Sequence, residues 1–593
     1  MTTDSLSELL SRQVDATPDA VAAIFGDDHL TYSAMSRQAR RVACALRTRG
    51  IEAETTVGIC LPPSLDLLTC LLGVIEAGGA FVPIDQNWPA QRREAVLTAS
   101  RVRLLISNEG FKASDAHPAL LVTTPAELSA ECSAGMSCPT SDAGLLAILF
   151  TSGTTARPKG VLLTSGGVTA QILKILQKCP YQDGDVNLLH RSFASVGFFR
   201  EWLGPLFSGA TLIVVPENEA KDPASLLSLA TRHHVTQMSA TPAMWDAVLD
   251  YVDRHPAEWA SLRIGRVGAD QVEDRLLSRW RQTFPGARLW NCYGCTECTS
   301  ACTHDATGSG TVSDIDAARE GLPGNEGLHI LDHRLRPVPA GRSGEIYLGG
   351  RGIARGYLES AANTALRFVP SPVAGEQGQR LLRTGDVGVL HSRHVLIIGR
   401  RDNRVKVRGF RVELEEIEAV LKAQPGVHDA AVVARSDKRN QTELVGFVVP
   451  TESALPPTST TLRRALLDIM AEYQVPAHFS IIDALPRTAL GKLDRASLSA
   501  TSASEVPSVE ADWSLSPFEI SMKDIWCDVL RVKHVAAQDS FFDIGGNSIA
   551  AMQMLCKVCD MFGVTLSFAC IFDYPTLRDF ARVAYNAVAT KEA

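Results

Sequence analysis

Residues 149–163, LFTSGTTARPKGVLL, run from an apolar stretch into a short polar loop that suits the binding of phosphate. Small residues let backbone N–H groups turn inward, hydroxyl side chains add donors, and a lysine supplies a mobile positive charge. A polar hairpin turn is the alternative, but it does not account for so many phosphate-binding residue types after a strand-like run. The pattern also differs from that of the P-loop. The candidate phosphate ligands are Thr151, Ser152, Gly153, Thr154, Thr155 and Lys159.

Four cysteines in residues 291–304, NCYGCTECTSACTH, have the C-x2-C-x2-C-x3-C spacing of bacterial iron–sulfur proteins. The proline that usually follows the fourth cysteine is absent, and Thr303 stands in its place. Free cysteines also serve as small buried hydrophobic residues. The spacing alone leaves both a metal cluster and a packed apolar segment open. The cysteines are Cys292, Cys295, Cys298 and Cys302.

A serine near the C-terminus, Ser548, follows two glycines in residues 539–554, DSFFDIGGNSIAAMQM. The glycines permit a tight turn, and the residues after Ser548 have the apolar periodicity of a helix. Serine is a favoured residue at a helix N-cap. Taken alone, this pattern therefore favours a helix cap over a modification site.

Length, charge and composition exclude several protein classes. The chain of 593 residues is too long for one hydrophobic core. A net charge of -8 argues against a nucleic-acid binder, which would carry a concentrated basic face. The sequence contains no apolar run long enough for a spanning helix, and residues 1–20 lack the apolar segment of a secretory signal. We expect a cytoplasmic protein with no nucleic-acid or membrane partner, whose 14 cysteines stay reduced.

The elements that must position these residues change character along the chain. Up to about residue 400, strand-like runs such as 56–61 alternate with amphipathic helical segments, which predicts an α/β fold with buried sheets. Residues 403–499 predict a small α+β unit of charged strands and a helix. Residues 500–513 have the composition of a linker, and residues 514–588 predict a small helical bundle.

The phosphate-binding loop and seven further segments, in order, resemble adenylate-forming enzymes, specifically the adenylation domains of nonribosomal peptide synthetases. The resemblance covers residues 8–500, and residues 539–554 resemble a peptidyl carrier domain. It implies a large multi-subdomain α/β core over residues 1–401, a small mobile α+β subdomain over 402–500, a linker over 501–513 and an all-α four-helix carrier bundle over 514–593. The segments are LTYSAMSRQA (30–39), IEAGGAFVPID (75–85), GEIYLGGRGIARGYL (344–358), LLRTGDVG (381–388), GRRDNRVKVRGFRVELEEIE (399–418), EYQVPAHF (472–479) and LPRTALGKLDR (485–495).

The resemblance implies roles for charged residues in the later segments. Asp386 would accept hydrogen bonds from the ribose hydroxyls of ATP, and Arg400 would contact ribose or phosphate. Asp402 matches the hinge about which the small subdomain rotates. Lys492 matches the lysine that bridges the substrate carboxylate and the α-phosphate, where a cation offsets the charge that develops during attack. Lys159 is the corresponding cation of the phosphate loop.

The cysteine-rich segment matches the family's adenine-binding motif. Tyr293 would stack on adenine, Asn291 would hydrogen-bond its edge beside Gly294, and Thr296 and Glu297 would hold phosphate and Mg²⁺, which prefers oxygen ligands. A four-cysteine cluster cannot use the same loop. We therefore expect Mg²⁺ at Glu297 and neither an iron–sulfur cluster nor a zinc ion.

The carrier resemblance implies that Ser548 carries 4′-phosphopantetheine, whose phosphodiester suits a helix N-terminus. Mg·ATP and an acid would give an acyl-adenylate, and the thiol on Ser548 would then take the acyl group. A thiol on the same chain acts at high effective concentration.

The segment that usually binds the substrate ammonium predicts an acid other than a typical α-amino acid. In residues 191–212, RSFASVGFFREWLGPLFSGATL, the aspartate that usually pairs with a substrate ammonium falls on Val196 or on Phe199, depending on the alignment. An unpaired ammonium in an apolar pocket is costly, so we expect a keto, hydroxy or aryl acid, or an amino acid held in an unusual way. Arg200 is a candidate partner for a second substrate carboxylate; a surface arginine paired with Glu201 or with another neighbour is the alternative. The implied pocket residues are Val196, Gly197, Phe199, Arg200, Ser239, Gly265, Val267, Gly268, Cys292, Ser300 and Ala301.

Two other classes share parts of the pattern. An acyl-CoA synthetase-like ligase uses the same adenylation chemistry, but the attached carrier disfavours it. An iron–sulfur electron-transfer protein would need the cysteines that the adenine loop occupies. We expect a free-standing loading module of natural-product (antibiotic) biosynthesis. Its expected partners are a phosphopantetheinyl transferase, a downstream condensation, tailoring or ketosynthase protein and, as a further candidate, an MbtH-like activator.

Overall fold

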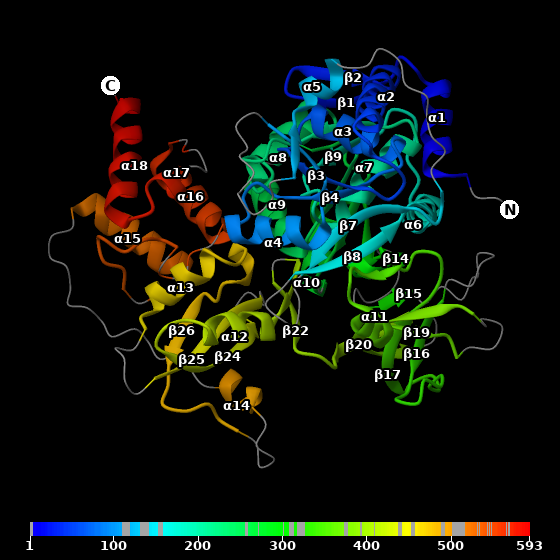
Figure 1. Ribbon diagram of the computed structural model, residues 1–593. Helices are drawn as coiled ribbons and strands as arrows, with labels where there is room; N and C mark the ends of the chain where they lie inside the picture. Colours follow the sequence, from blue (N-terminus) through cyan, green and yellow to red (C-terminus); the bar gives the residue numbers. More distant parts are fainter. Residues whose placement is uncertain are drawn as a thin grey trace. The chain divides into compact units, whose positions relative to one another are not determined.

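Figure 1 shows a computed structural model of the chain. It describes residues 4–108, 119–130, 141–151, 158–254, 259–270, 272–299, 302–307, 314–316, 327–372, 378–391, 394–407, 409–436, 442–451, 457–487, 493–500, 516–530, 532, 534–542, 544, 546, 548–564, 566 and 570–592. The chain divides into two compact units, the first ending at Arg411 and the second beginning at Val412. The boundary at residues 401 and 402 stays a prediction.

The first unit contains an eight-stranded sheet in the order β14-β13-β12-β11-β9-β10-β1-β2. Its inner strands run parallel, and the edge strands β2 and β14 run antiparallel. Parallel strands are buried on both faces, which explains their nearly continuous apolar sequences. The strands are β1 (Val21–Phe25), β2 (Asp28–Thr31), β9 (Val186–Leu189), β10 (Thr211–Val214), β11 (Gln237–Ala240), β12 (Ile264–Gly268), β13 (Arg288–Tyr293) and β14 (Cys302–Asp305).

Helices cover this sheet and fix which strand residues face which layer. Helices α8 (Pro223–Arg232), α9 (Pro242–Arg254) and α10 (Asp274–Thr283) form one apolar core with it. In that core the rings of Trp245 and Trp280 meet edge to face, with centroids 4.8 Å apart. Helix α7 (Val196–Phe207) contacts β9 and β10 and shares a different core with the second sheet.

A seven-stranded sheet, β18-β8-β7-β4-β3-β5-β6, forms the second layer system of the first unit. Its antiparallel hairpin of β7 and β8 flanks the predicted phosphate loop. The strands are β3 (Thr56–Cys60), β4 (Ala80–Pro83), β5 (Leu104–Ser107), β6 (Leu121–Thr123), β7 (Leu145–Thr151), β8 (Lys159–Thr164) and β18 (Gly356–Tyr357). The other helices are α1 (Leu6–Ala16), α2 (Tyr32–Thr48), α3 (Leu65–Glu76), α4 (Ala90–Ser100), α5 (Pro125–Ala130) and α6 (Ser165–Lys178).

A third sheet, β15-β21-β20-β17-β16 with β19 beside β20, completes the first unit. The antiparallel register of β20 and β21 places Asp386 directly opposite Arg400. Opposed residues share a face, so this register brings two predicted nucleotide-binding residues together. The elements are β15 (Asp314–Asp316), β16 (Leu328–Leu331), β17 (Ser343–Leu348), α11 (Ala361–Arg367), β19 (Phe368–Pro370), β20 (Arg380–His391) and β21 (His394–Arg400), followed by the pair β22 (Arg404–Val407) and β23 (Phe410–Glu413).

The second unit begins with a small α+β fold around the three-stranded sheet β24-β25-β26, which confirms the predicted fold of this region. Strands β24 and β25 pair antiparallel over nearly their whole length, and β26 adds in parallel. The elements are α12 (Leu414–Lys422), β24 (Val427–Ser436), β25 (Thr442–Pro450), α13 (Ser459–Leu467), β26 (His478–Ile481) and α14 (Arg495–Ala500).

The rest of the second unit is helical, as predicted. Trp526 lies at the centre of its apolar core, with its ring centroid 4.9 Å from that of Phe541 and 6.1 Å from that of Phe580. Ser548 is the first residue of α16, so the predicted attachment residue stands at a helix start. The helices are α15 (Pro517–Leu530), α16 (Ser548–Phe562), α17 (Cys570–Asp573) and α18 (Leu577–Glu592).

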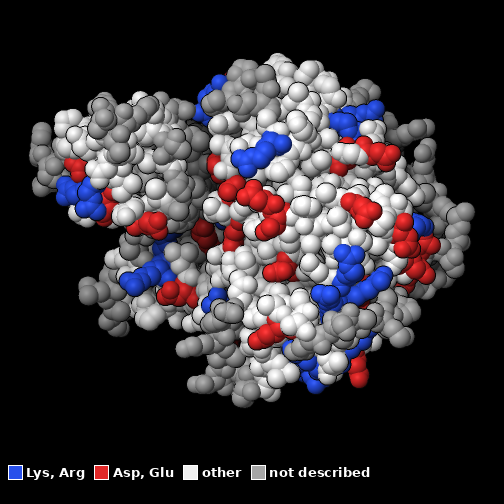
Figure 2. All heavy atoms as spheres, turned by 90° about the horizontal axis from the view of Figure 1, so that it is seen from above, with Lys and Arg blue, Asp and Glu red and all other residues white. Residues whose placement is uncertain are grey.

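Charged side chains of both signs are interspersed on the face that Figure 2 presents, with several acidic groups close to basic ones. This mixing accords with the modest net charge of -8 for a chain of this length. Within the described ranges, no helix is both long and apolar enough to cross a membrane.

Glu76, the last residue of α3, is a carboxyl group that the fold makes less acidic. Burial raises its pKa from 4.5 to about 7, and the charges of Arg40 and Arg47 only partly oppose the rise. The folded state therefore binds the proton more tightly than the unfolded chain. Below the unfolded-state pKa of 4.5 the carboxyl group is protonated in both states, and the stability of the fold is at its full value. As the pH rises from 4.5 through about 7, this contribution to stability is lost.

We expect Glu76→Gln to raise the free energy of unfolding of the first unit by roughly 2–3 kcal/mol at pH 8 and to change it little at pH 4. Calorimetric unfolding at the two pH values measures this difference. The exposed Glu52→Gln, on the nearby loop, is the control and should leave the curves unchanged. An equal stabilisation at both pH values would mean that packing, and not the proton, is responsible.

Candidate functional site

Three predicted nucleotide-binding residues form one hydrogen-bonded network. The phenol of Tyr293, at the end of β13, donates to Asp386 Oδ2 across 2.5 Å. The guanidinium of Arg400 binds Asp386 Oδ1, as the register of β20 and β21 requires. Burial, followed by the charge of Asp386, raises the pKa of Tyr293 well above its usual value, so the phenol stays a donor. The network holds a carboxylate with further acceptor capacity, which suits ribose hydroxyls.

Asp402, the predicted hinge, lies next to this network and contacts three arginines. Its carboxylate lies 2.8 Å from Arg400 Nε, 3.2 Å from Arg367 Nη2 and 3.4 Å from Arg404 Nε. Gly385 makes room for it: the residue has φ +83°, and a Cβ there would lie 2.5 Å from Asp402 Oδ2. Only glycine adopts that backbone region easily, which explains the glycine in RTGD. The hinge role of Asp402 stays a prediction.

Glu297, the predicted magnesium ligand, is 2% exposed and lies in a 3-10 turn, η1 (Thr296–Cys298). Its Oε1 accepts hydrogen bonds of 2.6 Å from the Tyr357 hydroxyl and 2.6 Å from Arg411 Nη1. Burial alone would raise the pKa of this carboxyl, but the charge of Arg411 and these hydrogen bonds lower it to about 2. Glu297 is therefore a carboxylate at any physiological pH.

One oxygen of Glu297 remains for a ligand. Oε2 is buried and has no hydrogen-bond partner among the described residues. A buried carboxylate oxygen without a partner is unfavourable unless a ligand satisfies it. A hard cation prefers such an oxygen, so the described residues fit Mg²⁺ at this place.

The structure describes the two ends of the predicted phosphate loop. Thr151 ends β7 and pairs with Lys159, the first residue of β8. The Thr151 hydroxyl is buried and has no hydrogen-bond partner among the described residues, as is suitable for a group that binds an external oxygen. The predicted residues Ser152, Gly153, Thr154 and Thr155 lie outside the described residues, as do Lys492, Ser300 and Ala301.

The remaining residues of the predicted adenine-binding motif lie within β13 or shortly after it. Asn291 lies within this strand, and Gly294 and Thr296 come directly after it. Of the cysteines, Cys292 is 6% exposed, and the sulfurs of Cys295 and Cys298 lie 3.5 Å apart. Over the described ranges, no group of three or more His, Cys, Asp or Glu residues could hold a metal ion.

The predicted acid-binding residues fall into two groups. Parallel register places Ser239 beside Arg266, and Arg266 beside Trp290, so Ser239, Arg266 and Cys292 share one face of the sheet. Gly265 and Val267 point to the other face: a Cβ on Gly265 would lie 2.1 Å from the Trp280 ring, and Val267 belongs to the core with α9 and α10. The structure thus does not bring these two residues together with Ser239.

Helix α7 provides the other predicted pocket residues. Val196 is its first residue, and Gly197 lies against Arg191. Phe199 packs on Phe81 of β4, with ring centroids 5.8 Å apart. Arg200 is 7% exposed, so the surface-arginine interpretation is wrong. Gly268, at the end of β12, lies against Cys292, where a Cβ would be 2.4 Å from the carbonyl oxygen.

Four residues at these sites were not predicted from the sequence: Arg191, Arg266, Tyr357 and Arg411. Arg266 gave a usable signal, because an arginine inside the apolar strand IGRVG must be buried with partners. Arg411 gave none, since it contacts a residue 114 positions away.

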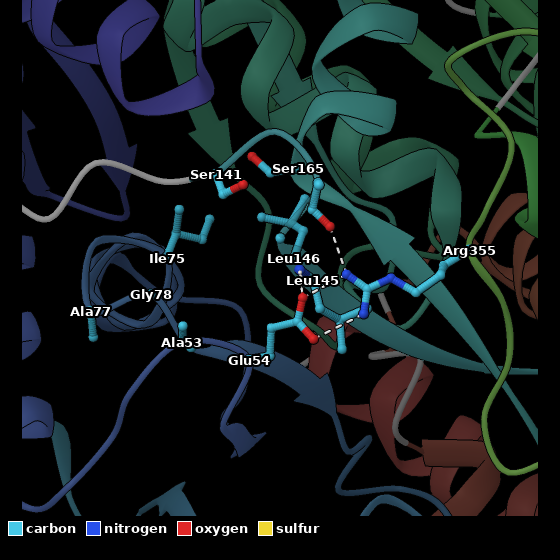
Figure 3. Close-up of a pocket in the computed structure, with 13 residues that line it drawn as sticks. Ala53, Glu54, Ile75, Ala77, Gly78, Ser141, Leu145, Leu146, Ser165 and Arg355 are labelled. Carbon is cyan, nitrogen blue, oxygen red and sulfur yellow. Dashed lines mark hydrogen bonds and ion pairs between the residues drawn. The ribbon is translucent and has the colours of Figure 1, made fainter.

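A separate cavity of about 540 Å³ lies near the phosphate-loop hairpin (Figure 3). Arg355 closes one side of it with two hydrogen bonds to the Glu54 carboxylate, of 2.9 and 2.5 Å, and one of 2.6 Å to the Ala143 carbonyl. The predicted site residues are not among its lining residues. Arg355 nevertheless lies two residues before Tyr357, so one segment contacts both this cavity and Glu297.

Comparison with protein families gives three matches in order along the chain. The model described as AMP-binding enzyme matches residues 10–358, and the AMP-binding enzyme C-terminal domain matches residues 416–492. The model described as phosphopantetheine attachment site matches residues 521–584. The first match alone covers more than half of the chain, and the third includes Ser548.

Curated relatives align over nearly the whole chain. Tyrocidine synthase 3 of Brevibacillus parabrevis is 33% identical over 98% of this chain, and a dimodular nonribosomal peptide synthase of Bacillus subtilis (strain 168) is 32% identical over 97% of it. The chain spans only 9% and 25% of the lengths of these two relatives.

Solved structures of nonribosomal peptide synthetase proteins also resemble this chain. A holo nonribosomal peptide synthetase protein, PA1221, which contains adenylation and PCP domains, superposes with a TM-score of 0.81 at 25% identity, covering 98% of this chain and 97% of that one. Holo-AB3403, a four-domain nonribosomal peptide synthetase bound to AMP and glycine, has a TM-score of 0.59 at 26% identity, covering 99% of this chain and 43% of that one.

Proposed function

The chain belongs to the AMP-binding enzyme family, and we propose that it activates a carboxylic acid with Mg·ATP and transfers the acyl group to 4′-phosphopantetheine on Ser548. The observation that carries this proposal is the order of domains in one chain. Both parts of an AMP-binding enzyme are followed by a phosphopantetheine attachment site. An acyl-CoA synthetase-like ligase would need no such site.

In the first step, a carboxylate oxygen of the acid attacks the α-phosphorus of ATP, and pyrophosphate leaves. Asp386 accepts the ribose hydroxyls while Tyr293 and Arg400 hold its carboxylate in place. Thr151 and Lys159 flank the loop that binds the phosphates. Lys492 supplies the cation that offsets charge at the reacting oxygens. Because Tyr293 and Arg400 hold Asp386 before the substrate arrives, this carboxylate needs little reorganisation in the transition state.

Glu297 would hold Mg²⁺ through its buried Oε2, while Tyr357 and Arg411 keep the carboxylate ionised and fixed in orientation through Oε1. When bound there, the cation supplies charge neutralisation for the phosphates. Thr296 is the neighbouring predicted phosphate contact.

In the second step, the acyl group moves from AMP to a thiol. Phosphopantetheine supplies that thiol when it is attached to Ser548. The start of α16 at Ser548 supports this position, because a helix N-terminus favours the negative charge of a phosphodiester. Asp402 is the proposed hinge for the movement of the small subdomain between the two steps.

The proposed partners follow from this chemistry. A phosphopantetheinyl transferase must modify Ser548, and a condensation, tailoring or ketosynthase protein must accept the loaded acyl group. An MbtH-like activator is a further proposed partner. The proposed location is the cytoplasm, and the proposed role is a loading module in natural-product biosynthesis.

An exchange assay tests the proposal. A suitable carboxylic acid should cause the purified protein to exchange labelled pyrophosphate into ATP. Intact mass should then show the acyl group only on protein that a phosphopantetheinyl transferase has modified. Unmodified protein should support exchange without becoming loaded. Equal acylation of free coenzyme A by the unmodified protein would instead indicate a CoA ligase.

A further inference from the structure

Three arginines of the first unit, Arg191, Arg200 and Arg266, form a cluster with Glu201 beside the predicted acid-binding residues. Arg200 is 7%, Arg266 2% and Glu201 1% exposed. The side chain of Arg191 is 15% exposed. We call these four residues the arginine cluster. Buried charges are costly unless opposite charges and hydrogen bonds satisfy them, so the partners of each arginine matter.

Arg191 pairs with the carboxylate of the cluster and lies at the start of α7. Its Nε is 2.7 Å from Glu201 Oε1. A Cβ on Gly197 would be 3.0 Å from Arg191 Cδ and 3.1 Å from its Nη1, so the absence of a side chain at Gly197 makes room for this guanidinium. Gly197 directly follows Val196, one of the two positions considered for an ammonium-binding carboxylate. A positive group therefore lies beside that position.

Arg266 has neutral partners among the described residues. It donates to the side-chain oxygen of Gln237, and its guanidinium lies 5.4 Å from the centre of the Tyr181 ring. The side-chain amide of Gln237 donates a hydrogen bond of 2.9 Å to Asp185, whose carboxylate also forms an ion pair with Arg263. The Arg266 guanidinium is thus stabilised by a polar side chain and an aromatic ring, and none of these contacts is a direct ion pair with a carboxylate.

The charge of Arg200 influences the pKa values of Arg191 and Cys179. Burial and the charge of Arg200 lower the pKa of Arg191, although Glu201 opposes the shift. The charges of Arg266 and Arg200 also oppose the rise that burial causes in the pKa of Cys179. The arginine cluster therefore brings three guanidinium groups to the surroundings of Glu201, of which Arg191 has the ion pair with this carboxylate.

The cluster adjoins the predicted acid site on two sides. Arg266 shares a sheet face with Ser239 and Cys292, and Arg191 lies against Gly197 of α7. The Ser239 hydroxyl is fully buried and has no hydrogen-bond partner among the described residues, which leaves a donor for a ligand. An ammonium group here would be repelled by the cluster. A carboxylate would be attracted and would match the planar guanidinium groups in geometry.

We propose, resting on the proposed function above, that the acid loaded by this chain is a dicarboxylic acid without an α-ammonium group. One carboxylate is activated by ATP, and the arginine cluster binds the other. The second carboxylate adds a negative charge beside buried guanidinium groups, and Arg200 and Arg266 determine the specificity for it.

A panel of acids matched in chain length tests this inference. It contains butanoate, succinate and aspartate; pentanoate, glutarate, 2-oxoglutarate and glutamate; and hexanoate, adipate and 2-aminoadipate. In at least one series, the dicarboxylic acid should support pyrophosphate exchange at least about tenfold better than the monocarboxylic acid and the amino acid. Preference for a monocarboxylic acid or an amino acid in every active series would overturn the inference and leave the proposed function intact. Exchange with no carboxylic acid of any class would overturn the proposed function itself.

Variants of the cluster give a second readout that does not depend on turnover. The best dicarboxylic acid should raise the unfolding temperature of the unaltered protein but not that of Arg200→Gln, whose KM for it should rise about 100-fold. Arg200→Lys keeps the charge without the planar fork and should fall between the two. Arg279→Gln, which removes an arginine that pairs with Asp250 and Asp253, is the matched control and should behave as the unaltered protein. An unchanged dicarboxylate preference in a folded Arg200→Gln would overturn the assignment of Arg200. If Arg200→Gln does not fold, the acid panel on the unaltered protein still decides.

Discussion

Ser548→Ala protein should form no thioester, while its acid-dependent pyrophosphate exchange stays within about twofold of the unaltered protein. The hydroxyl oxygen of Ser548 is the proposed attachment atom, so its removal leaves no position for the phosphopantetheine thiol. The residues proposed for adenylate formation belong to the first unit, together with Lys492, and the substitution leaves all of them unaltered. Loading should therefore be lost completely, and exchange should not. Intact mass after incubation with a phosphopantetheinyl transferase, ATP and acid measures the first, and the exchange assay measures the second.

The fold of the helical region makes this substitution a safe one to interpret. Ser548 is the first residue of α16, and the core of this region is formed by other residues, including Trp526, Phe541 and Phe580. The loss of a serine at a helix start costs about 1 kcal/mol, which a folded domain tolerates. Ser521→Ala, on α15, removes another serine hydroxyl and is the matched control, which should still be loaded. A loaded Ser548→Ala would place the attachment elsewhere and contradict the proposal.

Asp386→Ala should reduce pyrophosphate exchange by at least about 100-fold and lower the free energy of unfolding of the first unit by about 3 kcal/mol. Asp386 is 9% exposed, accepts from Tyr293 and binds Arg400. The substitution would leave the Arg400 guanidinium partly buried without one of its carboxylates and the Tyr293 hydroxyl without its acceptor. Exchange kinetics and thermal unfolding measure the two effects on the same preparation.

Two further variants separate binding from stability. Asp386→Asn keeps the shape and one acceptor, so it should recover part of the stability while the exchange rate stays low. Asp250→Ala removes an exposed aspartate that pairs with Arg279 on the surface and should change neither quantity, because exposed ion pairs contribute little. If Asp386→Ala kept full exchange activity with a normal KM for ATP, Asp386 would not be a ribose ligand.

The sequence was most informative where chemistry lies in short motifs. Asp386, Arg400 and Tyr293 come from separate motifs, and the structure joins them, because a β-hairpin register and a strand end bring them together. The alternation of strand-like and helical segments likewise predicted the α/β core. Periodicity within one element, and composition between elements, are enough for such conclusions.

The sequence was least informative where the side chain's direction or a distant partner matters. Gly265 and Val267 were assigned to the acid site by alignment, but strand alternation turns them towards Trp280. Arg411 contacts Glu297 through a pairing that no local pattern encodes. The surface interpretation of Arg200 failed for the same reason: its burial depends on how α7 packs between sheets formed by distant segments.

The end of the first unit at Arg411 determines where a chimaeric protein should be joined. Arg404 contacts Asp402, and Arg411 contacts Glu297, so both arginines are ion-paired within the first unit. A graft that exchanged the small subdomain and carrier at residue 402 would remove both arginines with the original part, and Glu297 would then depend on the foreign residue that replaces Arg411. A junction placed after Arg411 keeps each ion pair with its original partner, and it is the splice site we would choose.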